Sequence, residues 1–301
     1  MRIATAGSVV LVRAPAKVNL FLEVLAKRPD GYHDIATLML AIRLFDTLVF
    51  EEASEGASLE CNRPDLSTGP DNLMLRAARL LQEKTGCRRG VRMRLVKRIP
   101  LAAGLAGGST DAAATLAGLN KLWGLGRSIE DLALWSAEIG SDIPFFFHTP
   151  AAFCTGRGEK VAPVAVGRPL DLVLVCPKMG LSTAEVYRNS VLPGRPLSGE
   201  EICLALTAGD IEKIAGLLHN RLQLPAQKLY PTVAAWHERL GQLGAVGRMM
   251  SGSGSSLFAV CRDRAHAETI ARTLRTEADK EQAIVYVVRS CSSQPPRLCH
   301  R

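Results

Sequence analysis

The most constraining feature of this sequence is a run of small residues that leads directly into a helical pattern. The run, residues 100–111, reads Pro-Leu-Ala-Ala-Gly-Leu-Ala-Gly-Gly-Ser-Thr-Asp, and apolar residues at helical spacing follow it. Small residues let an anion approach the backbone, and the first turn of a helix presents unpaired N–H groups at the positive end of its dipole. We therefore predict a phosphate-binding loop and a helix over residues 109–122, with Ser109 or Thr110 as N-cap. Taken alone, the segment could also be a plain turn with close helix packing.

The familiar phosphate-binding motifs do not fit this run. No Lys follows the glycines as in G-x-x-x-x-G-K-[ST], and neither glycine cluster of the chain matches G-x-G-x-x-G. The chain also contains no D-F-G, no H-R-D and no G-x-S-x-G, which excludes protein-kinase and serine-hydrolase signatures. A different nucleotide-binding fold is required.

A second loop and two apolar segments carry further candidates. Residues 250–256 place six small residues between two predicted strands, more than a tight hairpin needs, which favours a ligand over an ordinary hairpin. Lys17 and Asn19 share one face of a predicted strand, and a buried Lys needs an anionic partner. Asp142, at the start of an apolar segment, is the obvious candidate. The alternatives are a surface Lys on an edge strand and an Asp in an ordinary turn.

The order of predicted elements favours an α+β fold in two domains rather than a doubly wound parallel sheet. Extended segments on both sides of the turn at residues 28–31 suggest an antiparallel opening sheet, with a break at Pro15. Pro and Gly cluster over 163–169, so we expect domains over residues 1–166 and 167–301. Hydrophobic periodicity predicts helices over residues 72–83, 128–139, 183–189, 199–206, 211–218, 232–243 and 264–278, and strands over 9–25, 91–96, 143–147, 170–176, 246–250, 257–260 and 283–289.

Composition narrows the class of protein. Apolar residues make up 47% of the 301 residues, which excludes disordered and collagen-like chains. The net charge is +8, but the basic residues are scattered, without long runs or interleaved aromatic residues, which favours an anionic small substrate over nucleic acid. Eight widely spaced cysteines without a C-x-x-C pair suggest free thiols. With no apolar stretch of about 18 residues, we expect a cytoplasmic protein without a membrane partner.

Three segments, 14–20, 100–114 and 251–260, resemble in order and spacing the three motifs of the GHMP kinases, small-molecule kinases for galactose, homoserine, mevalonate and phosphomevalonate. Residues 28–33 (Arg-Pro-Asp-Gly-Tyr-His) and 141–146 (Ser-Asp-Ile-Pro-Phe-Phe) resemble the branch that acts on a cytidine diphosphate ester of methylerythritol. The resemblance implies an ATP-binding N-terminal domain of the kind shared with ribosomal proteins and a ferredoxin-like α/β sandwich after it. It also implies ATP-dependent phosphorylation of the 2-hydroxyl of that ester, in the methylerythritol phosphate pathway to isoprenoid precursors.

The same resemblance assigns roles to individual residues. It makes Asp142 the catalytic carboxylate, with Lys17 beside it, and Asn19 a residue that places the substrate. Tyr32 would stack on the cytosine and His33 would bond to its edge. The other expected acceptor-site residues are Thr183, Tyr187, Gly252, Ser253 and Gly254. The expected ATP-binding residues are Asn72, Leu73, Pro100, Leu101, Ala102, Ala103, Gly104, Leu105, Ala106, Gly107, Gly108, Ser109 and Thr110.

A metal ion and the range of partners follow from the resemblance as well. Mg²⁺ would lie near Ser109 or Thr110, with Asp111 as a further candidate that would hold it through water. We expect ATP and the cytidine ester as small-molecule partners, no nucleic acid, and a monomer or weak homodimer. The alternatives are a mevalonate- or homoserine-type kinase, against which Tyr32 and His33 argue, and a nucleic-acid-binding module.

Overall fold

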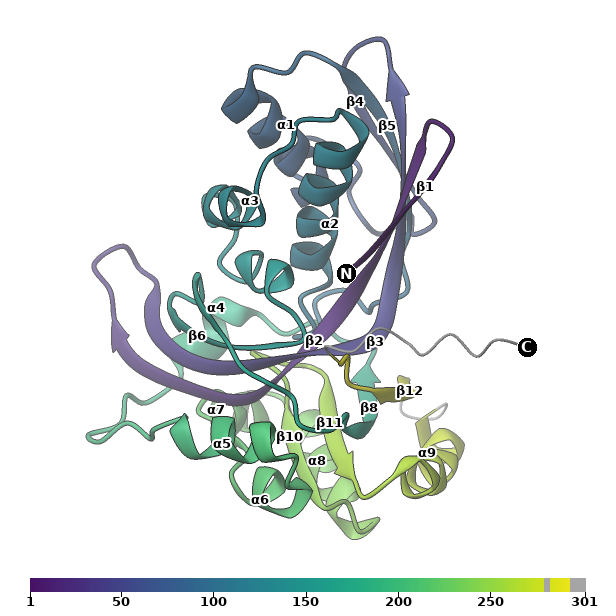
Figure 1. The fold of residues 1–301 in the computed structure, drawn as a ribbon. Coiled ribbons are helices and arrows are strands. Elements are labelled where there is room, and N and C mark those ends of the chain that lie inside the picture. The colour runs from purple at the N-terminus through teal and green to yellow at the C-terminus, as the bar shows by residue number, and fades with distance from the viewer. Residues whose placement is uncertain (279–281, 293–301) are drawn as a thin grey trace.

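The chain forms two sheets with helices packed on them, described here in a computed structural model over residues 1–278 and 282–292 (Figure 1). In those residues the first sheet has eight strands and the second has four, so the predicted α+β class is confirmed. The boundary between residues 166 and 167 separates β1 to β7 from the strands of the second sheet, but the first sheet also takes in β9 from beyond it, and the boundary stays a prediction. The first sheet contains β1 (Arg2–Ala6), β2 (Val9–Lys27), β3 (His33–Ala53), β4 (Ala57–Cys61), β5 (Gly90–Val96), β6 (Ala151–Gly156), β7 (Lys160–Pro163) and β9 (His219–Asn220).

The second sheet and the helices complete the fold. The second sheet is antiparallel, in the order β10-β11-β8-β12. Its strands are β8 (Asp171–Pro177), β10 (Gly247–Met250), β11 (Leu257–Cys261) and β12 (Ala283–Arg289). The helices are α1 (Leu73–Thr85), α2 (Gly107–Leu122), α3 (Ile129–Ser136), the 3-10 helix η1 (Pro144–Phe147), α4 (Thr183–Arg188), α5 (Glu200–Ala208), α6 (Ile211–Gly216), α7 (Gln223–Leu229), α8 (Pro231–Gln242) and α9 (Arg264–Ala278).

The antiparallel pair β2–β3 is a long hairpin that curves between the two parts of the molecule, with α1 to α3 on one side and the second sheet on the other (Figure 1). The expected break at Pro15 is wrong, because β2 continues through it. The pairing register shifts between Pro15 and Ala16, and this irregularity accommodates a residue that has no N–H to donate. The turn predicted at residues 28–31 is confirmed, since it lies between β2 and β3 and Gly31 has φ +85°.

Alternation along β8 and β11 explains how the second sheet is buried on both faces. Leu172 and Phe258 face the first sheet, where they pack with Val18 and Leu40 of the long hairpin. Residues one position along these strands face α8 and α9. The sheets are therefore joined through a shared apolar layer, and Cys291 N–H also donates to Ala41 O at 2.8 Å.

Two predictions about local structure are corrected. The segment 143–147, expected to be a strand, ends in the 3-10 helix η1 with Pro144 at its first turn, where a fixed φ and a missing N–H are tolerated. Helix α2 begins at Gly107, earlier than predicted, and its N-cap is Ala106 at φ +53° rather than Ser109 or Thr110. No side chain caps the helix, so the first-turn N–H groups of α2 have no side-chain acceptor.

Most other predicted elements are confirmed to within a few residues, including α1, which ends at Gly86 in the left-handed conformation, and β12, whose bounds agree with the prediction. The elements that the sequence analysis missed are β1, β4, β6, β7, β9 and α7. Among the residues described, no disulfide forms and seven cysteines are free, while Cys299 lies outside them. No helix in the described ranges is long and apolar enough to cross a membrane.

Candidate active site

A cleft of about 430 Å³ lies where β2, the loop before α2, the segment before η1 and the loop between β10 and β11 meet. Most of the residues predicted to form the site line it. These are Lys17, Asn19, Leu73, Pro100, Leu101, Ala102, Ala103, Gly104, Ala106, Gly107, Gly108, Ser109, Asp142, Thr183, Tyr187, Gly252, Ser253 and Gly254. The predicted residues outside this lining are Tyr32, His33, Asn72, Leu105 and Thr110.

Lys17 and Asp142 meet in this cleft. The Lys17 Nζ lies 3.7 Å from an Asp142 carboxylate oxygen, and the Lys17 side chain is 4% exposed while that of Asp142 is 30% exposed. The Lys17 ammonium also donates to Asn19 Oδ1 at 2.7 Å and to Gly104 O at 3.0 Å. Burial lowers the pKa of Lys17, and the Asp142 carboxylate opposes this by favouring the charged form. Lys17 of β2 thus links Asn19, the first small-residue loop and the partly exposed carboxylate of Asp142.

The two loops of small residues pack directly on each other. Gly104 has φ +72°, and a Cβ on it would lie 2.1 Å from Ser251 O. The Ser251 hydroxyl donates to Gly104 O at 2.9 Å, and Ser256 N–H donates to Ala103 O at 3.2 Å. The loop between β10 and β11 is therefore not a free hairpin turn but a support for the first loop.

The first loop is shaped to hold an anion. Ala102, Gly104 and Ala106 all have positive φ, and this curls the backbone around the N-terminus of the 16-residue helix α2. Gly107 and Ser109 then face the cleft in the first turn of that helix. Curled backbone N–H groups and the positive end of a helix dipole together form a favourable phosphate site.

The side chains of Ser109 and Thr110 lie in different environments. Ser109 lines the cleft, whereas Thr110 is 0% exposed and its Oγ1 has no hydrogen-bond partner. In the described part of the chain, no group of three or more His, Cys, Asp or Glu side chains could hold a metal. Mg²⁺ usually binds through one or two carboxylates together with phosphates and water, so the Ser109 hydroxyl and the Asp142 carboxylate fit an ion that arrives with a nucleotide.

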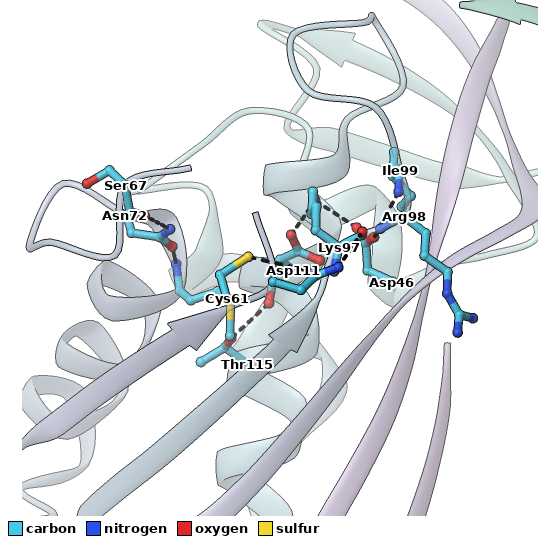
Figure 2. Close-up of polar contacts among 11 residues, drawn as sticks. Asp46, Cys61, Ser67, Asn72, Lys97, Arg98, Ile99, Asp111 and Thr115 are labelled. Carbon is cyan, nitrogen blue, oxygen red and sulfur yellow. Dashed lines mark hydrogen bonds and ion pairs between the residues drawn. The ribbon is translucent and has the colours of Figure 1, made fainter. Parts of the chain in front are cut away.

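A buried ionic cluster that the sequence analysis missed lies behind the first loop (Figure 2). Lys97 Nζ lies 2.7 Å from an Asp46 oxygen and 2.5 Å from an Asp111 oxygen. The other Asp46 oxygen accepts the backbone N–H groups of Arg98 and Ile99 at 2.5 and 2.9 Å. Asp111 therefore lies inside the protein, 2% exposed, and not on the cleft where a metal was expected. Burial raises the pKa of Asp111 well above its ordinary value, although Lys97 opposes this.

Asn72 and Leu73 have separate roles at the edge of the cleft. The Asn72 side chain accepts from Met74 N–H and donates to Ser67 O, so its amide caps α1 (Figure 2). Leu73, in the first turn of that helix, lines the cleft. A Cβ on Gly108 would lie 3.4 Å from the Leu73 side chain, which brings α1 and the first loop into contact.

Two residues that line the cleft, Tyr187 and Arg157, contact aromatic residues outside its lining. The His33 ring lies 4.9 Å from the Tyr187 ring, and the guanidinium of Arg157 lies 5.1 Å from the centre of the Tyr32 ring. Thr183 and Ser253 share a hydrogen bond of 2.8 Å between their hydroxyls. Arg157 lines the cleft and was not predicted, although its place between two glycines marks a turn where a side chain can project.

Comparison with known proteins assigns the family. The model of the GHMP kinases N terminal domain matches residues 72–149, and that of the GHMP kinases C terminal matches residues 203–280. The 4-diphosphocytidyl-2-C-methyl-D-erythritol kinase of Shouchella clausii is 42% identical over 91% of this chain and 93% of its own length. The enzyme of that name from Symbiobacterium thermophilum is 44% identical over 84% of this chain and 91% of its own. The chain belongs to the GHMP kinases.

Solved structures of GHMP kinases agree with this assignment. A crystal structure of 4-(cytidine 5'-diphospho)-2C-methyl-D-erythritol kinase matches 94% of this chain and 100% of its own, with a TM-score of 0.79 and 36% identity. A homoserine kinase from Cytophaga hutchinsonii matches 97% of both chains with a TM-score of 0.75 but 17% identity, which shows the fold alone. Sequence likeness therefore favours the cytidine-ester branch over the homoserine-type alternative.

Proposed function

We propose that this GHMP kinase transfers the terminal phosphoryl group of ATP to the 2-hydroxyl of 4-diphosphocytidyl-2-C-methyl-D-erythritol, on the route to isoprenoid precursors. The observation that carries the proposal is the Lys17–Asp142 pair at 3.7 Å, which lies in one cleft with the phosphate-shaped loop and with Tyr187, the residue that contacts His33. Relatives that bear this enzyme name are about 40% identical over most of the chain.

The proposed transfer relies on positioning and on charge. The acceptor hydroxyl attacks the terminal phosphorus, the new O–P bond forms as the bond to ADP breaks, and Asp142 accepts the hydroxyl proton late in the step. Lys17 lies 3.7 Å from Asp142 and offsets negative charge beside the first loop. The loop N–H groups around Gly107 and Ser109 hold the phosphates in line. Mg²⁺ bound with ATP would neutralise phosphate charge, and Ser109 and Asp142 are the cleft residues that would hold it.

Tyr32 and His33 support recognition of the cytidine. Tyr32 is 55% exposed, so its ring is free to stack on a base. Burial lowers the pKa of His33, as does the charge of Lys27, and both favour the neutral imidazole, the form that can donate and accept at a base edge. Arg157, next to Tyr32, would offset the charge of a diphosphate.

Binding partners and location belong to the same proposal. ATP and a cytidine diphosphate ester are both polyanions, and the net charge of +8 favours their approach to a shared cleft. The free cysteines of the described chain, Cys154 and Cys176 among them, suit a reducing compartment, so we propose a cytoplasmic enzyme. We propose a monomer or weak homodimer without a nucleic-acid partner.

The test is Mg²⁺-dependent ADP release from ATP with the cytidine ester, measured beside mevalonate and homoserine, with phosphorus NMR of the product. A new phosphate monoester formed only with the cytidine ester supports the proposal. Turnover with another alcohol keeps the kinase activity but contradicts the roles of Tyr32 and His33. No turnover with any of the three contradicts the proposal and leaves salt-dependent binding of RNA or DNA as the next measurement.

A further inference from the structure

A two-residue strand ties the second half of the chain to the catalytic strand. β9 (His219–Asn220) pairs in parallel with Phe21 and Leu22 of β2, and Arg221 N–H donates to Leu22 O at 2.9 Å. Lys17 and Asn19 lie just before this contact on β2. A segment that is hydrogen-bonded to β9 is thereby fixed relative to Lys17 and Asn19, the residues proposed to act in transfer.

Asn220 of this strand holds the loop between β10 and β11. Its Nδ2 donates to Met250 O and to Gly252 O, both at 2.8 Å, and its Oδ1 accepts Leu222 N–H at 2.9 Å. Asn220 is 8% exposed, so no solvent replaces these bonds easily. Both protons of the amide are used, and a reversed amide would place its oxygen against two carbonyl oxygens.

The loop segment that Asn220 holds touches the catalytic residues. Gly252 lines the cleft at φ +57°, and a Cβ on it would lie 3.3 Å from Lys17 Nζ and 3.4 Å from Asn19 Oδ1. Through Ser251 the same loop bonds to Gly104 O of the phosphate-shaped loop. A displacement of Gly252 would therefore change how the two loops and Lys17 are placed relative to one another.

An ion pair between Glu23 of β2 and Arg221, the residue after β9, also holds β9 in place. The Glu23 side chain is 0% exposed and accepts two hydrogen bonds from the Arg221 guanidinium, at 2.7 and 2.8 Å, and one from Leu197 N–H at 3.1 Å. Burial alone would raise the pKa of Glu23, but these hydrogen bonds outweigh it and hold the pKa below its ordinary value. A bidentate pair of this kind has a defined geometry, so Arg221 keeps Asn220 in register with β2.

We propose that Asn220 is a positioning residue for phosphoryl transfer, which holds Gly252 against Lys17 and Asn19 and so fixes the second loop between the nucleotide and the acceptor. The Glu23–Arg221 pair anchors Asn220 to the catalytic strand. This inference rests on the proposed function for its effect on turnover, but the placement of the loop can be measured without any activity.

The deciding variant is Asn220→Asp, which keeps the side-chain size and replaces the Nδ2 donor with an oxygen that the Met250 and Gly252 carbonyls repel. Its matched control is Asn120→Asp at the far end of α2. There a simpler amide pattern occurs, since Asn120 donates one hydrogen bond, to Arg127 O, and accepts one, from Arg127 N–H, both at 2.9 Å. Any general cost of this substitution thus appears in both variants.

Hydrogen exchange gives the first readout, and kinetics give the second. We expect Asn220→Asp to speed exchange of the amides over residues 251–256 and to lower kcat by about 10- to 100-fold, with little change in KM for ATP. The control should leave both unchanged. A merely structural role would lower thermal stability and the amount of active enzyme, but not kcat per active site.

Each result decides between the alternatives. Unchanged exchange over residues 251–256 overturns the inference, and so does altered exchange with unchanged kcat in an active enzyme. If the wild-type chain has no kinase activity, the proposed function fails, while the exchange data still show whether Asn220 holds the loop. If Asn220→Asp does not fold, Asn220→Ala, which introduces no repulsion, carries the same two measurements.

Discussion

Asp142 combines partial exposure to the cleft with an ammonium 3.7 Å away, which suits a carboxylate that contacts a substrate beside a fixed positive charge. We predict that Asp142→Asn lowers kcat by about 10²- to 10⁴-fold, because the amide cannot accept the hydroxyl proton. ATP affinity should change much less than kcat, since the variant keeps the phosphate-shaped loop and the Ser109 hydroxyl. ADP release and nucleotide titration calorimetry measure the two effects. Retained turnover would remove Asp142 from the mechanism.

Asp111 provides a prediction about stability and pH. Burial raises its folded-state pKa above the ordinary value of 3.8, so the folded protein binds this proton more tightly than the unfolded chain does. The contribution of the protonated Asp111 carboxyl to the free energy of unfolding is fully present below about pH 4. It is lost as pH rises through the folded-state pKa of this group. Asp46 and Lys97 are the charged groups that face it.

Asp111→Asn removes this titration and keeps an oxygen for Lys97. We therefore predict that the free energy of unfolding of the variant increases relative to wild type as pH rises from about 4 to 8, by about 1.4 kcal/mol for each pKa unit of the shift. Urea unfolding at a series of pH values measures the difference. A difference that stays constant or declines with pH would show that Asp111 is ionised throughout.

The sequence identified some of these residues and not others. Lys17 and Asp142 could be named because a cation in an apolar strand and a carboxylate before an apolar segment both need a partner. Lys97 could not be named, because it directly follows β5, whose alternation is that of a strand with one solvent-facing side. Its partners Asp46 and Asp111 are 51 and 14 residues away in sequence, and only the tertiary fold brings them together.

Among elements, the contact between the two small-residue loops is the most sensitive to a single Cβ. We predict that Gly104→Ala sharply lowers kcat and ATP affinity, because the new methyl group meets Ser251 O at 2.1 Å in addition to a strained φ of +72°. Gly124→Ala is the control, with φ +64° and nothing within 4 Å of the new Cβ. It should lose only about 1–2 kcal/mol of stability and keep its activity. Equal behaviour of the two variants would contradict the close contact.

The helices were largely predictable, whereas several strands were not. Periodicity over three or more turns identified α1, α8 and α9, because one face of each helix is buried. Short strands such as β9 exist through pairing with distant partners, so their own residues carry little signal. The segment 143–147 was misassigned because a short apolar run has no periodicity to separate a strand from a helical turn, and the effect of Pro144 was underestimated.

At the scale of the whole molecule, the shared apolar layer between the sheets couples the two halves of the chain. We predict a single cooperative unfolding transition, with the same urea midpoint reported by Trp123 of the first half and Trp236 of the second. Single-tryptophan variants made by replacing the other tryptophans with Phe allow each fluorescence signal to be measured alone. Two separate midpoints would show that the halves unfold independently.

The long hairpin has a consequence for how such an enzyme could diverge. Lys17 lies within β2, and His33 opens β3 opposite Lys27, so the transfer end and the proposed base-recognition end of the cleft belong to one covalent ribbon. Side chains alternate between faces along a strand, so insertions or deletions that preserve the inward face must come two residues at a time in each strand. A related enzyme would therefore adapt to an acceptor substrate of different length in discrete steps. Each step would change both strands of the hairpin by two residues and leave the nucleotide loop unchanged.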